Sequence, residues 1–440
     1  MAVEEAGAVT IEALLESGAI VGHKDGNHGS QYPRVEEFGP VGVPFLTAKS
    51  LSDGKIDIAG APRLAEDRAD ALRFGFVQPG DVLLSHNATV GRVAVVPEFA
   101  GRMLIGTSLT YFRVDPEKIS PRYLAAYFGG KAFQDELAAV MSHSTRNQVP
   151  ITAQRRLRVV LPSLPVQRGI AHILGTLDDK IELNRRMNET LEATARAIFK
   201  SWFVDFDPVR AKAEGRDTGL PPHIADLFPD AFEDSELGEI PKGWAVRSLD
   251  EIADFLNGLA MQKYPPTTAN QLPVIKIAQL RAGDANGADL ASADIDPAYI
   301  IEDGDILFSW SGSLECVLWS GGKGALNQHL FKVTPSRYPR WLCYLGIQQH
   351  LDEFRHIAAG KATTMGHIQR QHLSDAKLPI PPADLLKTMG TFVEPAIEST
   401  WRRMVQSRTL MSLRDTLLPK LISGELRLEG AERLIGGTDA

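Results

Sequence analysis

Two long stretches of the chain carry apolar residues at alternating steps of four and three positions, which is the spacing of a coiled-coil seam. The first stretch follows Pro165 and continues without a proline or a turn cluster to Asp207 and Pro208. It predicts one helix of about 35 residues, which would be roughly 50 Å long. Its seam consists of Ile170, Leu174, Leu177, Ile181, Asn184, Asn188, Leu191, Ala195, Ile198 and Trp202.

The same spacing returns 216 positions later in a less regular form, through Leu386, Gly390, Val393, Ile397, Thr400, Met404, Ser407, Met411, Arg414 and Leu418. By itself this second seam would indicate an ordinary amphipathic helix, because Pro395, Ser407 and Arg414 weaken it. The shared spacing favours pairing of the two helices. Polar seam residues such as Asn184, Asn188 and Thr400 would then fix the register of the pair, or else they lie near solvent at a subunit boundary.

The stretches that precede the two helices contain short apolar runs bounded by Gly, Pro and Asn, which is typical of strands and turns. Such runs occupy residues 81–85, 92–96 and 109–114, and a short helix is expected at 122–128 because Pro121 supplies a start signal. The mixture of strands with a short helix predicts an α+β fold for each stretch.

An internal repeat connects the two halves of the chain. Four segments return in the same order, at separations that drift from 224 to 217 residues. The pairs are Pro79–Ser85 with Asp303–Ser309, Phe112–Val114 with Phe331–Val333, Pro121–Leu124 with Pro339–Leu342, and Leu161–Pro165 with Leu378–Pro382. The chain is therefore predicted to be an internal duplication, in which each copy is a globular domain followed by a long helix.

The predicted organisation comprises a first domain (1–164), a central long helix (165–203), an acidic linker (204–243), a second domain (244–382), a distal long helix (383–427) and a tail (428–440). A chain of 440 residues has room for two or three domains. No apolar run approaches the length of a membrane span, and the acidic N-terminus does not have the pattern of a secretion signal. We therefore expect no membrane helix and a cytoplasmic protein.

The formal net charge of −8 argues at first against a nucleic-acid partner. Most of this excess comes from residues 204–242, which hold ten acids and four bases. Basic windows occur once in each half. Residues 141–160 hold Arg146, Arg155, Arg156 and Arg158 without an acid, and residues 354–377 hold Arg355, Lys361, Arg370 and Lys377 against Asp375. Local basic surface is thus expected in both copies.

No recognisable catalytic or metal site stands out in the sequence. Gly130–Lys131 and Gly360–Lys361 lack the spacing of a phosphate loop, residues 321–324 predict a turn, and the histidines form no zinc motif. Cys316 and Cys343 lie in apolar runs, where free thiols are usually buried. The segment Asp296–Tyr299 is similar to a tetrapeptide of amino-methyltransferases, but its third residue is Ala and no glycine-rich cofactor loop precedes it, so it is predicted to be a turn before a strand.

The pattern as a whole resembles the specificity subunit of type I restriction–modification systems. The resemblance lies in the Leu-Pro exit from each domain, the helix 167–202, its tail Ser201–Val209 and the segment Gly238–Trp244 that opens the second domain. It implies two target-recognition domains, each reading one half of a split double-stranded DNA target, with an antiparallel pair of helices between them. It also implies that the chain is not an enzyme and binds no cofactor or metal.

The resemblance further implies partner subunits. Two methyltransferase subunits would modify adenine N6 with S-adenosylmethionine, and restriction subunits would add ATP-dependent translocation and cleavage. Two other functions stay open from the residues alone. One is a single-chain DNA methyltransferase that uses Asp296–Tyr299, and the other is a duplicated protein-binding scaffold without a DNA role.

Candidate DNA contacts are polar residues on loops at matched positions of the two copies, because base edges are read by such side chains. In the first domain they are Lys49, Ser85, His86, Asn87, Thr89, Arg92, Thr145, Arg146, Asn147 and Gln148. In the second they are Lys276, Gln279, Trp310, Ser311, Lys361, Thr363, Thr364 and His367. Trp310 is placed either to stack at a base step or to pack on its own domain.

Overall fold

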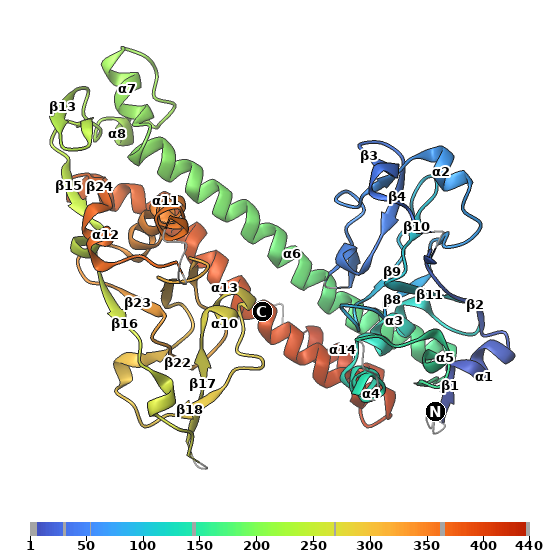
Figure 1. The fold of residues 1–440 in the computed structure, drawn as a ribbon. Coiled ribbons are helices and arrows are strands. Elements are labelled where there is room, and N and C mark those ends of the chain that lie inside the picture. Colours follow the sequence, from blue (N-terminus) through green and yellow to red (C-terminus); the bar gives the residue numbers. More distant parts are fainter. Residues whose placement is uncertain are drawn as a thin grey trace. The chain divides into compact units, whose positions relative to one another are not determined.

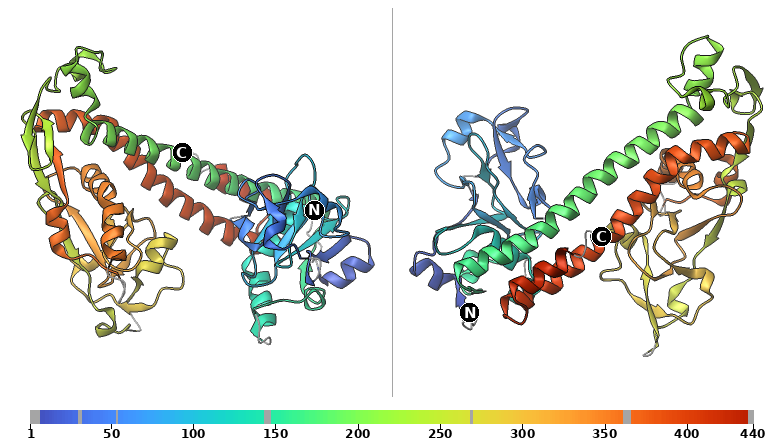
Figure 2. Two further views of the ribbon diagram at one scale, coloured as in Figure 1. Left: turned by 45° about the horizontal axis from the view of Figure 1, so that its top comes forward. Right: turned by 180° about the vertical axis from the view of Figure 1, so that it is seen from behind.

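The computed structural model describes residues 7–29, 32–52, 54–142, 147–267, 270–360 and 366–436. The chain forms two compact units, one made of residues 1–180 and 410–440 and the other of residues 181–409. Two helices of 40 residues, α6 (Leu164–Phe203) and α13 (Ala383–Ile422), each contribute residues to both units. Figure 1 and Figure 2 show both helices as continuous along their whole length.

The first unit is built around an antiparallel sheet in the order β2-β11-β8-β9. Side chains alternate across β8, so that Val82 and Leu84 join one apolar core and Leu83 joins another. Helix α3 packs on β8 and β9. The bounds are β2 (Ile20–Asp25), β8 (Val82–Ser85), β9 (Val93–Val95), β11 (Leu109–Val114), α3 (Pro121–Gly129) and α4 (Lys131–Ser142).

The second unit repeats this sheet in the order β16-β23-β20-β21, with helix α11 packed on β21 and β23. Each domain adds a second small sheet, β10-β4-β7-β3 in the first and β18-β17-β22-β19 in the second. The predicted α+β fold with an internal duplication is confirmed. The bounds are β16 (Ala253–Asn257), β20 (Ile306–Ser309), β21 (Cys316–Leu318), β23 (Leu330–Pro335) and α11 (Arg340–Ala359).

The remaining elements complete the two domains. In the first unit they are β1 (Ala8–Thr10), α1 (Ile11–Glu16), η2 (Val35–Glu37), β3 (Phe38–Gly39), β4 (Val43–Leu46), η3 (Ala48–Ser50), β5 (Leu51–Ser52), β6 (Lys55–Ile56), β7 (Arg63–Leu64), α2 (Glu66–Asp70), β10 (Leu104–Ile105), α5 (Ile151–Gln154), β12 (Arg158–Val160) and α14 (Leu428–Gly436). In the second they are β15 (Ala245–Ser248), α9 (Leu249–Ile252), η4 (Met261–Lys263), β17 (Gln271–Ile275), α10 (Ile277–Ala282), β18 (Leu290–Ser292), η5 (Pro297–Tyr299), β19 (Ile300–Ile301), β22 (Gly324–Leu326), α12 (Arg370–Asp375) and β24 (Lys377–Ile380).

Strand pairing corrects one of the matches drawn from the sequence. Leu109 lies opposite Ser85 in the first sheet, and Leu330 lies opposite Ser309 in the second. Phe112 therefore corresponds to Val333 and not to Phe331. The sequence match is displaced by two residues, which a strand tolerates because side chains repeat on the same face every second residue.

The two long helices pair in an antiparallel sense in the second unit. The middle of α6 meets the middle of α13 where Asn184 Nδ2 donates to Gln406 Oε1 at 2.9 Å and to Ser407 Oγ at 3.2 Å. The end of α6 meets the early part of α13 where the rings of Trp202 and Phe392 lie 5.7 Å apart. This direction matches the expectation from the resemblance.

The predicted seam residues of α6 are all buried or half-buried. In α13 the buried residue near position 411 is Leu410, which is 2% exposed, whereas Met411 is 39% exposed. The covered face thus lies one residue earlier there than the heptad spacing placed it. At this point Leu410 supplies the buried apolar side chain, and Met411 is turned toward solvent.

Asn184 offers a test of the polar seam. Its side chain is 2% exposed and is hydrogen-bonded across the pair, whereas the Oδ1 atom of Asn188 is buried without a hydrogen-bond partner. Asn184→Ala should therefore lower the free energy of unfolding by about 1–2 kcal/mol, because Gln406 and Ser407 lose their partner. Asn188→Leu should leave the free energy of unfolding unchanged or raise it. Urea titration of both variants measures these changes. Equal losses for the two variants would contradict a specific role for Asn184.

The segment predicted to be an acidic linker is folded. It forms α7 (Asp207–Ala213), α8 (Pro222–Ala225), β13 (Phe232–Ser235) and β14 (Gly238–Pro241). Phe206, Val209 and Phe228 join the large core of the second unit, while most of its acids are exposed. Its charge is therefore a property of the outer face, and its aromatic residues supply the folding energy.

Candidate nucleic-acid interface

A serine closes the hairpin after the central strand in both domains. Ser85 Oγ accepts a hydrogen bond from the backbone N–H of Arg92 at 2.8 Å, and Ser309 Oγ accepts one from Glu315 at 2.8 Å. Both serines are 0% exposed. The hydroxyl of Ser85 is thus used to hold the hairpin that carries His86, Asn87 and Thr89.

A second loop lies against this hairpin in each domain. In the first domain the N–H of Val149 donates to His86 O at 2.8 Å and that of Ala88 donates to Asn147 O at 3.1 Å. Asn87 lies opposite Gln148 in the same short bridge. The structure thereby brings together two predicted loops that are about 60 residues apart in the sequence.

The second domain repeats this bridge atom for atom. The N–H of Ile368 donates to Trp310 O at 2.9 Å and that of Gly312 donates to Gly366 O at 2.8 Å, with Ser311 opposite His367. Ala88 and Gly312, at equivalent tips, both have left-handed backbone, with φ of 64° and 67°. The following residues, Thr89 and Ser313, are exposed. The two domains therefore share one backbone frame and differ in the side chains that it presents.

The third matched pair, Lys49 and Lys276, lies in a short turn after β4 and β17. Both lysines are exposed, and Lys276 Nζ pairs with Asp289. Gln279 is buried, and its side chain accepts from the N–H of Lys276 at 3.3 Å, so it closes the turn. The guanidinium of Arg92 donates to Ala48 O and Leu51 O, which ties the hairpin of the first domain to the Lys49 turn.

Trp310 is half-buried in the second domain, and its polar atom is occupied. Its Nε1 donates to Asn257 Oδ1 at 2.9 Å and to Gln328 O at 3.1 Å. Ser311 is 2% exposed and lies 3.0 Å from His329 Nδ1. Thr145, Arg146, Lys361, Thr363 and Thr364 lie outside the described residues and stay predictions.

A buried polar cluster lies under the loops of the first domain, and sequence reasoning missed it. Asp25 Oδ1 accepts from Thr110 Oγ1 at 2.6 Å and lies 3.5 Å from Nε2 of His86. Gln154 donates to Thr110 Oγ1 and lies 3.0 Å from His23 Nε2. The strand pairing aligns this cluster with Phe255, Asn257 and Phe331 of the second domain, which are mostly apolar. The sequence carries no local signal for it, because its members come from β2, β11 and α5.

The two buried histidines predict a pH dependence of the first domain. Burial lowers the pKa of His23 and of His86 below the ordinary value of about 6.5, against the opposing charge of Asp25. Below pH ~6.5 the unfolded chain therefore binds more protons than the folded domain, so stability is lost as the pH falls from there toward the folded pKa values.

Urea unfolding at a series of pH values, followed by far-ultraviolet circular dichroism, should show this loss. The His23→Gln variant should have a smaller slope of unfolding free energy against pH. All six tryptophans lie in residues 181–409, so their fluorescence reports the second unit alone and serves as an internal reference. An unchanged slope in the variant would contradict the assignment to His23.

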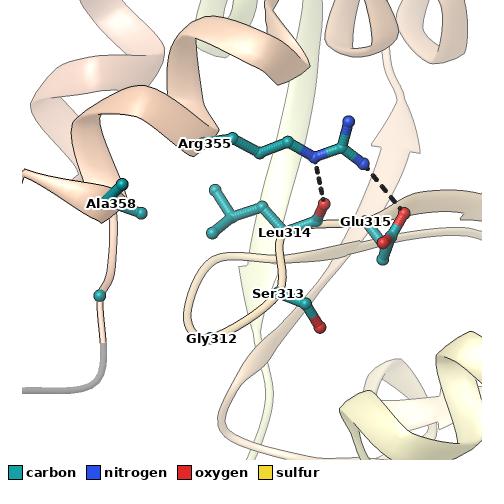
Figure 3. A pocket seen from close by; sticks show the side chains of 8 residues that line it. Gly312, Ser313, Leu314, Glu315, Arg355 and Ala358 are labelled. Carbon is teal, nitrogen blue, oxygen red and sulfur yellow. Dashed lines mark hydrogen bonds and ion pairs between the residues drawn. The ribbon is translucent and has the colours of Figure 1, made fainter. Parts of the chain in front are cut away.

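A cavity of about 390 Å³ lies beside the hairpin of the second domain. Figure 3 shows Arg355 reaching from α11 toward the hairpin residues Leu314 and Glu315, with Ala358 lining the cavity from the same helix. The charge of Arg355 is balanced by Glu315 at 3.2 Å and Asp352 at 3.0 Å. The cavity is thus not a free basic pocket for a phosphate.

The segment with similarity to a methyltransferase motif is a turn, as predicted. Asp296 Oδ1 accepts from the N–H of Ala298 at 2.9 Å, and β19 follows directly. The carboxylate is therefore used locally. Cys316 and Cys343 are buried as expected. Within the described part of the chain there is no group of three His, Cys, Asp or Glu residues that could hold a metal ion, and none of its helices is long and apolar enough to cross a membrane.

Two blocks of the chain, residues 35–193 and 241–400, match the family described as the type I restriction modification DNA specificity domain. The chain belongs to this family. The two blocks coincide with the two copies of the duplication, so the resemblance seen in the sequence is confirmed. The protein is a DNA specificity subunit of a type I restriction–modification system and has no catalytic role of its own.

Relatives match over nearly the whole length of the chain. The MjaIX specificity subunit of Methanocaldococcus jannaschii is 24% identical over 90% of this chain and 89% of its own. The HindI specificity subunit of Haemophilus influenzae is 23% identical over 84% of this chain and 89% of its own. The crystal structure of the S subunit from M. genitalium has a TM-score of 0.53 at 14% identity, covering 94% of this chain and 95% of its own, which shows a shared fold.

Proposed function

We propose that each domain of this specificity subunit reads one half of a split double-stranded DNA target through its two joined loops. The observation that carries the proposal is the shared backbone bridge, which presents Asn87 and Gln148 in one domain and Ser311 and His367 in the other. A constant frame with different side chains is what two related readers of different base sequences require.

The proposed roles divide by exposure. Exposed or half-exposed side chains at the bridge would read base edges, namely Asn87, Thr89, Asn147 and Gln148 in the first domain and Ser313 and His367 in the second. Trp310, whose Nε1 is already hydrogen-bonded, would stack at a base step. The buried side chains Ser85, His86, Gln279 and Ser311 would hold the loops. Lys49 and Lys276 would contact phosphates, because a flexible ammonium group positions the backbone without reading sequence.

We further propose that the subunit directs two methyltransferase subunits, and restriction subunits where present, to this target in the cytoplasm. S-adenosylmethionine and ATP would be bound by those partners and not by this chain. In this proposal the partners supply much of the positive charge that faces the phosphates, so a net charge of −8 on this chain is compatible with DNA binding.

Selection of bound fragments from a random DNA pool tests the proposal, with the chain reconstituted with its methyltransferase subunits. The expected result is two short blocks of fixed bases separated by a spacer of constant length. Equal retention of all sequences would overturn the proposal in favour of a protein-binding scaffold. Methyl transfer to DNA by the isolated chain would overturn its assignment as non-catalytic.

A further inference from the structure

We propose that Gln134 in the first domain and Arg355 in the second are positioning residues, which fix the DNA-reading hairpin by holding one backbone carbonyl. This inference rests on the proposed function of the hairpins. Both residues lie on helices that follow the central sheet, and neither is on a loop that would meet DNA.

In the first domain the amide of Gln134 bridges helix α4 and the hairpin. Its Nε2 donates to Gly91 O at 2.9 Å and to Phe128 O at 2.6 Å. Gly91 has a φ of +96°, and a Cβ built on it would lie 2.3 Å from the Oε1 atom of Gln134. The positive φ favours glycine at this position, and a Cβ there would displace the amide of Gln134.

In the second domain the guanidinium of Arg355 makes the equivalent contact between helix α11 and the hairpin. Its Nε donates to Leu314 O at 3.1 Å, and a second nitrogen lies 3.2 Å from the carboxylate of Glu315. The cavity beside the hairpin leaves little side-chain packing between Gly312 or Ser313 and Ala358 (Figure 3). On the α11 side the hairpin is thus held by the buried side chain of Leu314 and by the hydrogen bond from Arg355 to the carbonyl of that residue.

The two contacts fall on equivalent atoms. Ser85 and Ser309 bind the N–H groups of Arg92 and Glu315, so these two residues correspond. The residues just before them, Gly91 and Leu314, therefore correspond as well, and theirs are the carbonyls that Gln134 and Arg355 hold. The same contact is made by two unlike side chains, one on helix α4 and one on helix α11. This indicates that the hairpin itself needs a donor at this carbonyl.

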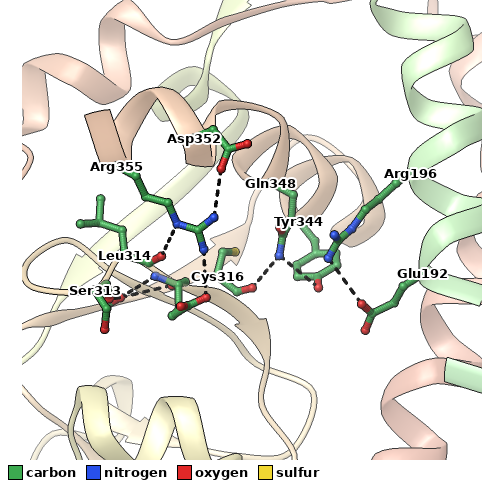
Figure 4. Close-up of polar contacts among 11 residues, drawn as sticks. Glu192, Arg196, Ser313, Leu314, Cys316, Tyr344, Gln348, Asp352 and Arg355 are labelled. Atoms are coloured by element: carbon green, nitrogen blue, oxygen red, sulfur yellow. Dashed lines mark hydrogen bonds and ion pairs between the residues drawn. The ribbon is translucent and has the colours of Figure 1, made fainter. Parts of the chain in front are cut away.

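Helix α11 also holds the strand that leaves the hairpin. Figure 4 shows Gln348 on the same helix as Arg355, seven residues earlier, and the Nε2 atom of Gln348 donates to Cys316 O at 2.7 Å. Among the hydrogen bonds described between α11 and the hairpin, that of Arg355 thus lies nearest to the tip at Gly312 and Ser313, which is also held by the bond from Gly312 N–H to Gly366 O. Loss of the Arg355 donor would let the tip move, and hydrogen bonds to base edges weaken steeply when distance or angle changes.

The test uses the chain reconstituted with methyltransferase subunits and measures base preference at each half-site by selection from random DNA. Gln134→Glu keeps the shape of the side chain but removes the donor, and Arg355→Ala removes the guanidinium. Each variant should lose about tenfold of the base discrimination in one half only, with the other half unchanged. Arg355→Lys should restore part of the loss, because it keeps a donor on a long side chain.

Matched controls lie one or two residues away on the same helices. Asp135→Asn and Glu353→Gln change exposed side chains that pair only within their own helix, and they should leave both half-sites unchanged. Selection is carried out well below the thermal midpoint of each variant, so that a loss in one half only separates positioning from general destabilisation. Unchanged preference in both halves, or an equal loss in both halves, would overturn the inference. If Asn87→Ala also fails to alter base preference, the proposed function is contradicted as well. If Asn87→Ala alters it but Gln134→Glu and Arg355→Ala do not, only the positioning role is contradicted.

Discussion

Inserting seven residues into both long helices is expected to lengthen the spacer between the two half-sites while leaving the bases of each half-site unchanged. The insertions belong after Lys180 and after Thr409, where each helix passes from one unit to the other. These points lie opposite each other, since Asn184 contacts Gln406 in one unit and Asp178 pairs with Arg414 in the other. Contacts within each unit are therefore kept.

The size of the effect follows from helix geometry. Seven residues add about 10 Å and nearly two full turns, so the covered faces stay aligned. The spacer can then grow by up to about three base pairs, and binding to the original site should fall at least about a hundredfold, because the two domains no longer meet both halves together. An insertion in α6 alone should instead impair folding. Altered half-site bases with an unchanged spacer would refute the idea of a molecular ruler.

Replacing both Asn87 and Thr89 by Ala is expected to remove fixed bases from one half of the target only. Both residues stand at the tip of the first hairpin, and neither side chain is fully buried. A side chain that pairs well with a base edge contributes about 1–3 kcal/mol of discrimination, so the double variant should lose roughly tenfold to a thousandfold at the bases that it reads. Competition binding with single-base variants of the selected site measures this loss.

Ser313→Ala provides the matched change at the tip of the second hairpin, and it should affect the opposite half. An effect of either variant on total affinity without a change of base preference would indicate phosphate contact instead. The salt dependence of binding separates the two cases, because loss of a phosphate contact lowers the slope of affinity against salt.

The long helices and the duplication could be predicted from the sequence because both depend on local spacing. The seam of α6 and the strand 109–114 correspond closely to the structure, since burial of one face imposes a period that the residues must follow. The matched loops could be paired between the copies, but nothing local indicates that Asn87 and Gln148 lie opposite each other. That contact depends on how strands meet in three dimensions.

The rest of the site depends on partners that are distant in sequence. The two-residue error in matching Phe112 arose because a strand tolerates such a shift without changing faces. The cluster of His23, Asp25 and Gln154 could not be predicted either, because its members are up to about 130 residues apart. The charge of segment 204–243 predicts a linker, whereas its aromatic residues pack into the core of the second unit. Gln134 gave no signal, because one amide on an amphipathic helix is not distinguishable from a solvated one.

Photo-crosslinking from the two hairpin tips tests the central claim most directly. A photoreactive amino acid at Thr89 or at Ser313, both exposed and at equivalent positions, would be introduced into the chain and bound with its methyltransferase subunits to the selected DNA. The account predicts that position 89 crosslinks to bases of one half-site and position 313 to bases of the other. Crosslinks from both positions to the same half-site, or from neither to the fixed bases, would contradict it.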